Sequence, residues 1–180
     1  MNKLYLIIIG KISNIDIDKV RESLGLENLR PGKLRDMFSA QLILEGYCIG
    51  KYKDNVLIVS PVAVFEFFNV EIGPFAKRVS DVFADKEIVV LTLYSVIDSY
   101  GFAVVSNGER LRAKWGGEGD KIYIDYGDKI KEENEVNEEA FVDGSHLGTN
   151  IVHMLLRRYF GKDDKEVESN LCKINLLEYK

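Results

Sequence analysis

Residues 87–116, EIVVLTLYSVIDSYGFAVVSNGERLRAKWG, contain the strongest secondary-structure signals in the chain. Residues 87–96 are almost wholly apolar, which predicts a strand buried on both faces of a sheet. Residues 102–105 and 109–114 have the composition of two further strands, joined by Ser106-Asn107-Gly108. Asn-Gly favours a tight hairpin because both residues tolerate a positive φ angle. The stretch therefore predicts a central β-hairpin within 87–116.

Strand and helix patterns continue on both sides of this stretch. The apolar run 3–9 predicts another interior strand, and residues 47–52 and 56–60 flank a short polar turn. Residues 62–70 are rich in Val and Phe and fit a short helix or an extended run equally well. Apolar residues at helical spacing predict helices over about 16–24, 30–42, 74–83 and 145–160. We expect an α+β fold, with a mixed, mainly antiparallel sheet and about four helices packed on it, in a single domain over 1–180.

The composition supports a core that needs no metal ion or disulfide. Of the 180 residues 46% are apolar, and nine Tyr, nine Phe and one Trp add large buried surfaces. Cys48 and Cys172 lie in apolar runs and form no CxxC motif, which predicts two buried thiols in a reducing compartment. The apolar run near the start is too short for a signal peptide or a membrane span, so we expect a cytoplasmic protein with no membrane partner.

The negative charge is concentrated in one segment. The chain has 24 basic and 29 acidic residues, a net charge of −5, but residues 117–143 alone hold ten acidic and three basic side chains, a balance of −7. The rest of the chain is therefore +2, with no strongly basic stripe, and we expect no nucleic-acid partner. Residues 129–139 read as a charged loop. Such a segment can attract a basic protein partner over a long range.

The chain lacks the common catalytic motifs. No P-loop, no GxSxG and no GxGxxG after a strand is present, so we predict no cofactor. His146, His153 and Arg157 share one polar stripe of the helix expected at 145–160 and could form a binding or catalytic rim or a solvated edge. The two His are about 10 Å apart along the helix axis, too far to share one metal ion. We therefore predict no metal site there.

Asp98 is the one acidic turn residue that merits a catalytic hypothesis. It follows a predicted central strand and precedes a glycine turn, as a magnesium-binding carboxylate can. A turn carboxylate that bonds its own backbone is the simpler interpretation. Carboxylates at Asp125 and Asp128 could join Asp98 around a divalent ion, with help from His146 or Arg157, if the fold brings them together.

Three short stretches resemble an uncharacterised bacterial family of unknown function. They are LYSVIDSYGFAV at 93–104, NGERLR at 107–112 and IDYGD at 124–128. The resemblance extends over roughly residues 45–160. It implies a small bacterial cytoplasmic protein, and it implies no activity, ligand or catalytic residue.

Two functional hypotheses follow from the sequence. The first is a non-enzymatic binding or interaction protein that uses the acidic segment 117–143 against a basic partner. The second is a small metal-dependent hydrolase or nucleotide-handling enzyme that uses Asp98 with Asp125 or Asp128. The sequence leaves the oligomeric state open.

Overall fold

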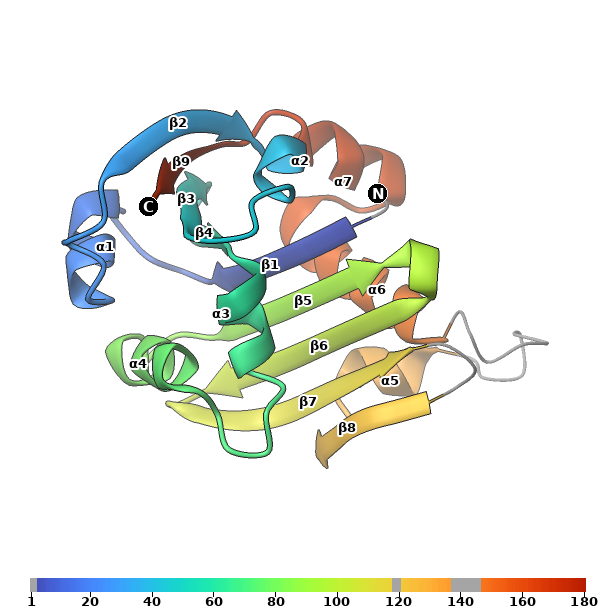
Figure 1. The fold of residues 1–180 in the computed structure, drawn as a ribbon. Coiled ribbons are helices and arrows are strands. Elements are labelled where there is room, and N and C mark those ends of the chain that lie inside the picture. The colour runs from blue at the N-terminus through green and yellow to red at the C-terminus, as the bar shows by residue number, and fades with distance from the viewer. Residues whose placement is uncertain (1–2, 118–120, 137–146) are drawn as a thin grey trace.

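Nine strands form one antiparallel sheet within the described part of the chain (Figure 1). The computed structural model describes residues 3–117, 121–136 and 147–180. The strands follow the order β2-β9-β3-β4-β1-β5-β6-β7-β8 across the sheet, and each neighbouring pair is antiparallel. Their bounds are β1 (Lys3–Ile9), β2 (Pro31–Asp36), β3 (Tyr47–Tyr52), β4 (Asn55–Val59), β5 (Ile88–Tyr94), β6 (Ser99–Ser106), β7 (Glu109–Gly117), β8 (Lys121–Gly127) and β9 (Asn175–Tyr179). The predicted α+β class and mainly antiparallel sheet are confirmed.

Helices cover both faces of the sheet. The described helices are α1 (Ile17–Ser23), α2 (Met37–Ala40), α3 (Pro61–Glu66), α4 (Pro74–Val82), α5 (Lys131–Glu135), α6 (Leu147–Phe160) and α7 (Asp164–Leu171). In the view of Figure 1, α3 and α4 lie in front of the sheet, whereas α5 and α6 lie behind it. Four of the described helices have seven residues or more, as many as predicted. The shorter helices α2, α3 and α5, with four to six residues each, bring the number above the prediction.

The strand β1 shows how one apolar run serves two cores. Every side chain from Leu4 to Ile9 is buried. Because successive strand residues point to opposite faces, Leu4, Leu6 and Ile8 pack with α6 and α7. The alternate residues Tyr5, Ile7 and Ile9 pack with α1, α3 and α4. The predicted interior position of this strand is confirmed, since β4 and β5 pair with it on either side.

The predicted hairpin is also confirmed. Asn107 and Gly108 have φ angles of 53° and 75° at the turn between β6 and β7. The connection before it, from β5 to β6, is a short 3-10 turn at Ser95–Ile97 followed by Asp98, whose φ is 49°. The stretch thus forms three neighbouring strands, β5, β6 and β7, and β7 then pairs with β8 at the edge of the sheet.

The helix predicted over 30–42 is wrong in its first half. Residues 31–36 form β2, which pairs with β9 near the other end of the chain, and helix α2 occupies only Met37–Ala40. Leu34 and Phe38 do recur at helical spacing, but strand pairing with a distant segment outweighs this local pattern. Leu34 is exposed as a result.

Three smaller expectations are also settled. The charged loop expected at 129–139 contains a helix, α5, whose Glu133 is buried. The ambiguous run 62–70 begins as helix α3, with Ser60 accepting a hydrogen bond from the backbone of Ala63 at the start of the helix. Cys48 is buried as predicted, but Cys172 is exposed because it caps the end of α7. None of the described helices has the length and apolar character needed to cross a bilayer.

Candidate protein-interaction surface

The described part of the acidic segment lies along one edge of the sheet. Residues 121–127 form β8, the last strand in the sheet order, and a short turn leads to α5 behind it (Figure 1). The other residues of the segment, 118–120 and 137–143, lie outside the described residues. The edge strand β8 and the helix α5 are therefore the elements on which the predicted interaction surface can be examined.

A buried arginine ties β8 and α5 to the rest of the sheet. Arg112 on β7 is only 2% exposed. Its Nε donates to Glu133 Oε2 and its Nη2 to Glu133 Oε1, each at 2.7 Å. Its Nη1 donates to the carbonyl oxygens of Tyr126 and Gly127, at 3.0 and 3.1 Å, and to the carboxylate of Asp125. One guanidinium thus connects three elements, β7, β8 and α5.

The surroundings of this pair satisfy both partners. Glu133 Oε2 also accepts from the backbone N–H of Ile130 at 3.0 Å, and Lys114 Nζ lies 3.9 Å from Oε1. The hydrogen bonds to Glu133 raise the pKa of Arg112 further above its usual value, so the guanidinium stays charged. A buried bidentate pair of this kind fixes geometry, because any other arrangement leaves a charge without partners. The start of α5 is held in one place.

The same contacts neutralise part of the acidic segment. Asp125 and Glu133 are both paired with Arg112. Glu132 lies 3.6 Å from Arg158 on α6, and Glu135 lies 3.2 Å from Lys131 within α5. The described carboxylates are therefore less available to a partner than the sequence count of −7 indicates. Those that remain exposed are Asp125 and Asp128 near the end of β8 and Glu135 on α5.

A hollow of about 580 Å³ lies beside α5, between this helix, β6 and α6. Its apolar lining comes from Val104, Ile130 and Met154. Its charged lining is a set of three carboxylates and two cations, from Glu87, Glu132, Glu135, Lys131 and Arg158. The carboxylates are ion-paired with Arg158 and Lys131, and the lining keeps a balance of −1. A lysine or arginine side chain of a partner can pack its aliphatic stem on the apolar lining and place its charged end near these carboxylates.

Glu87 is the most firmly held carboxylate of this hollow. Both of its oxygens accept from Arg158 Nη2, at 2.7 and 2.6 Å, and the hydroxyl of Tyr159 donates to Oε1. Burial and the nearby Glu87 carboxylate raise the pKa of Tyr159, so the phenol remains a hydrogen-bond donor. Glu87 therefore forms the fixed side of the hollow, and α5 supplies Glu132, which is mostly buried, and Glu135, which is about half exposed.

The sheet register keeps Asp98 away from Asp125. Asp98 precedes β6, whereas Asp125 on β8 lies opposite Lys114, which in turn lies opposite Phe102. The two aspartates are thus separated by two strand spacings, roughly 10 Å, and by several residues along the strands. Asp128 is exposed in the turn after β8. No described group of three His, Cys, Asp or Glu side chains could hold a metal ion, so the enzyme hypothesis gains no support from this geometry.

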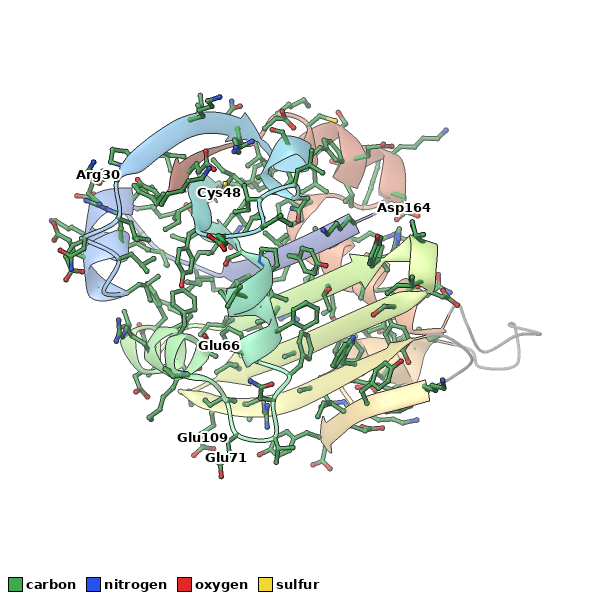
Figure 2. The ribbon with its side chains drawn as sticks, in the orientation of Figure 1. Arg30, Cys48, Glu66, Glu71, Glu109 and Asp164 are labelled. Atoms are coloured by element: carbon green, nitrogen blue, oxygen red, sulfur yellow. The ribbon has the colours of Figure 1, made fainter. Side chains whose placement is uncertain are left out.

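The polar stripe on α6 joins this helix to α7. Arg157 donates to both oxygens of Asp164, at 2.9 and 2.8 Å, and His153 Nδ1 lies 3.4 Å from the same carboxylate. The Arg157 guanidinium lowers the pKa of Asp164. Asp164 lies in the upper part of the view in Figure 2, whereas β8 runs along the lower edge. Arg157 is therefore not brought to Asp125 or Asp128, and His146 lies outside the described residues.

The sequence interpretation missed a second charged cluster, at the opposite side of the sheet. Glu178 on β9 is buried, and its Oε1 accepts from Arg35 at 3.1 Å and lies 2.8 Å from Lys180 Nζ. The hydrogen bond to Lys180, and after it the one to Arg35, contribute most to lowering the pKa of Glu178 to about 2. Burial raises the pKa of the neighbouring Cys48 thiol to about 11. Glu178 lies on the same face of β9 as the buried Leu176. The alternation of residues along this strand is the one sequence signal that could have predicted the burial of Glu178.

Arg35, Glu178 and Lys180 of this cluster line a second hollow of about 630 Å³. Leu42 and Leu44 line it and are largely exposed. Arg35 and Lys180 already share the one carboxylate of Glu178, and Glu45 adds a second acidic group to the lining. The charges of this hollow therefore nearly balance, and its chemistry selects no class of ligand.

Comparison with models of known protein families, with curated proteins and with solved structures finds no match to this chain. The resemblance of residues 93–104, 107–112 and 124–128 to an uncharacterised bacterial family stays a prediction.

Proposed function

We propose that the protein is a non-enzymatic binding protein of the bacterial cytoplasm, and that it uses the surface of β8 and α5 to hold a basic protein partner. The observation that supports this most is the hollow beside α5. Its apolar lining and its carboxylates complement lysine and arginine side chains. The buried pair between Arg112 and Glu133 adds to this, because a surface that is already ordered loses little entropy on binding.

Neutralising the two acids of α5 that line the hollow tests the proposal. The double variant Glu132→Gln/Glu135→Gln removes two charges that line the hollow. We expect it to bind a short lysine-rich peptide roughly tenfold more weakly than the native protein, at low salt, because each solvated ion pair contributes a fraction of 1 kcal/mol up to about that value. Fluorescence anisotropy of a labelled peptide measures the affinity.

A matched variant separates a local effect from the effect of total charge. Glu22→Gln/Glu27→Gln lies on and just after α1, which Figure 1 shows far from α5. It changes the net charge from −5 by the same two units, to −3. We expect this variant to bind the peptide as the native protein does. Equal weakening in both variants, or native binding that is insensitive to salt, contradicts the proposal.

A further inference from the structure

The strand β8 is an open edge of the sheet with apolar side chains on it. It pairs with β7 and has no other strand beside it among the described residues. Ile122, Tyr123 and Tyr126 are between 46% and 50% exposed. An edge strand leaves backbone N–H and C=O groups without ladder partners, and exposed apolar residues next to such an edge are typical of interaction sites.

The second half of β8 is a regular and firmly held template. A register shift at the Trp115–Gly116 position leaves residues 124–127 paired without interruption to residues 115–112. Arg112 holds this run in place, since its Nη1 donates to two consecutive carbonyl oxygens there, those of Tyr126 and Gly127. The other edge strand, β2, begins with a proline and has an irregular register with β9 between Pro31 and Leu34. The edge at β8 is thus the better site for an added strand.

The side chains of β8 present different chemistry on the two faces of the sheet. On the α3 face, the ring of Tyr123 lies 4.8 Å from that of Trp115, and Arg110 lies 4.4 Å over the ring of Tyr126. On the α5 face, Asp125 forms an ion pair with Arg112 and remains half exposed. An extended segment with alternating apolar and basic residues would place the apolar ones against the tyrosines and the basic ones toward Asp125 and α5.

We infer that β8 receives an extended, basic segment of the partner as a tenth strand of the sheet, and this inference rests on the proposed function. Backbone hydrogen bonds would supply affinity, and the alternating side chains would supply selectivity. Charge argues against a second copy of the chain as the occupant. Residues 121–136, the described part of the acidic segment, hold five acidic and three basic side chains. Two copies joined at β8 would bring two such negative stretches together, and like charges across a strand pair are destabilising.

Backbone methylation of a probe peptide tests strand addition without changing its charge. The probe has seven residues, the length of β8, with lysine and valine alternating. Two modified versions carry N-methyl groups, one on the lysine amides and the other on the valine amides. In an added strand one set of amides faces β8 and the other faces solvent. We expect one methylated peptide to bind roughly tenfold or more weakly and the other to bind like the parent, since several backbone hydrogen bonds are lost in one case only.

The outcomes separate this inference from the proposed function. If both methylated peptides bind as well as the parent, strand addition is wrong while the acidic binding surface stands. If the parent does not bind, or if a peptide with glutamate in place of lysine binds equally well, the proposed function itself fails. A dimer in sedimentation without peptide, with slow hydrogen exchange at 121–127, would show that a second copy occupies the edge and would overturn the inference.

Discussion

Arg112 is the residue on which the candidate surface depends. Its side chain is 2% exposed and lies among the apolar residues of the α6 face, with the ring of Phe102 6.0 Å from the guanidinium carbon. A charge in such a place is costly unless its hydrogen bonds are complete. All three of its nitrogens have acceptors, and the acceptors come from β8 and α5. The surface is thus fixed from within.

Replacement of this arginine by an apolar residue is expected to be strongly destabilising. Arg112→Met leaves Glu133 buried without its main partner, and breaking a buried pair in this way costs about 3–5 kcal/mol in the free energy of unfolding. Urea denaturation followed by circular dichroism measures the loss. The double variant Arg112→Met/Glu133→Leu removes both charges, so we expect it to regain much of that stability. A loss below about 1 kcal/mol for the single variant would contradict the assigned role.

Glu178 predicts a pH dependence of stability at the acidic end. Its pKa is about 2 in the folded chain, against an ordinary value of 4.5. The folded state thus binds this proton less tightly than the unfolded state does. The stabilisation is complete above about pH 4.5 and is lost as the pH falls toward 2. We expect the free energy of unfolding of Glu178→Gln to depend less steeply on pH in this range than that of the native protein. Parallel curves of unfolding free energy against pH for the two proteins would contradict this.

The hairpin between β6 and β7 shows how much one local signal can determine. Gly108 has a φ of 75°, a conformation that costs a residue with a side chain roughly 1–2 kcal/mol. We expect Gly108→Ala to lower the free energy of unfolding by about that amount. Gly10→Ala is the matched control, because its added Cβ would meet only ordinary contacts at 3.6–3.7 Å. Equal effects of the two substitutions in thermal unfolding would show that the turn conformation is not the cause.

The elements that the sequence predicted poorly are those that depend on distant partners. Asn107-Gly108 and the apolar run of β1 contain their own information, so they were predicted correctly. The strand β2 forms because β9, far along the chain, pairs with it. The five-residue helix α5 is held by Arg112, and no pattern within 129–139 indicates that one of its acids is buried.

The candidate site could be predicted only in outline. The count of charges located the acidic segment at 117–143. It could not show that Asp125 and Glu133 point inward to one guanidinium, because that depends on which face of β7 carries Arg112. Nor could it show that Asp98 and Asp125 lie apart, since their separation is set by the register of β6, β7 and β8.

At the scale of the whole molecule, the acidic segment and the open strand edge coincide. Outside 117–143 the chain carries a balance of +2, so the excess negative charge of the sequence lies in this segment. Its described part lies at the β8 edge of the sheet, with α5 behind it (Figure 1). Under the proposed function, a basic partner is attracted toward the same edge that offers backbone hydrogen bonds, and this attraction weakens as salt screens it.

Hydrogen exchange of the native protein tests this account most directly. Amide exchange would be compared with and without the alternating lysine and valine peptide, with the exchange read out along the chain by mass spectrometry. We expect slower exchange over residues 121–135, which include β8 and α5, and no change over α1 or β2. Slower exchange at β2 instead, around the hollow lined by Leu42 and Leu44, would contradict the claim that β8 and α5 form the binding surface.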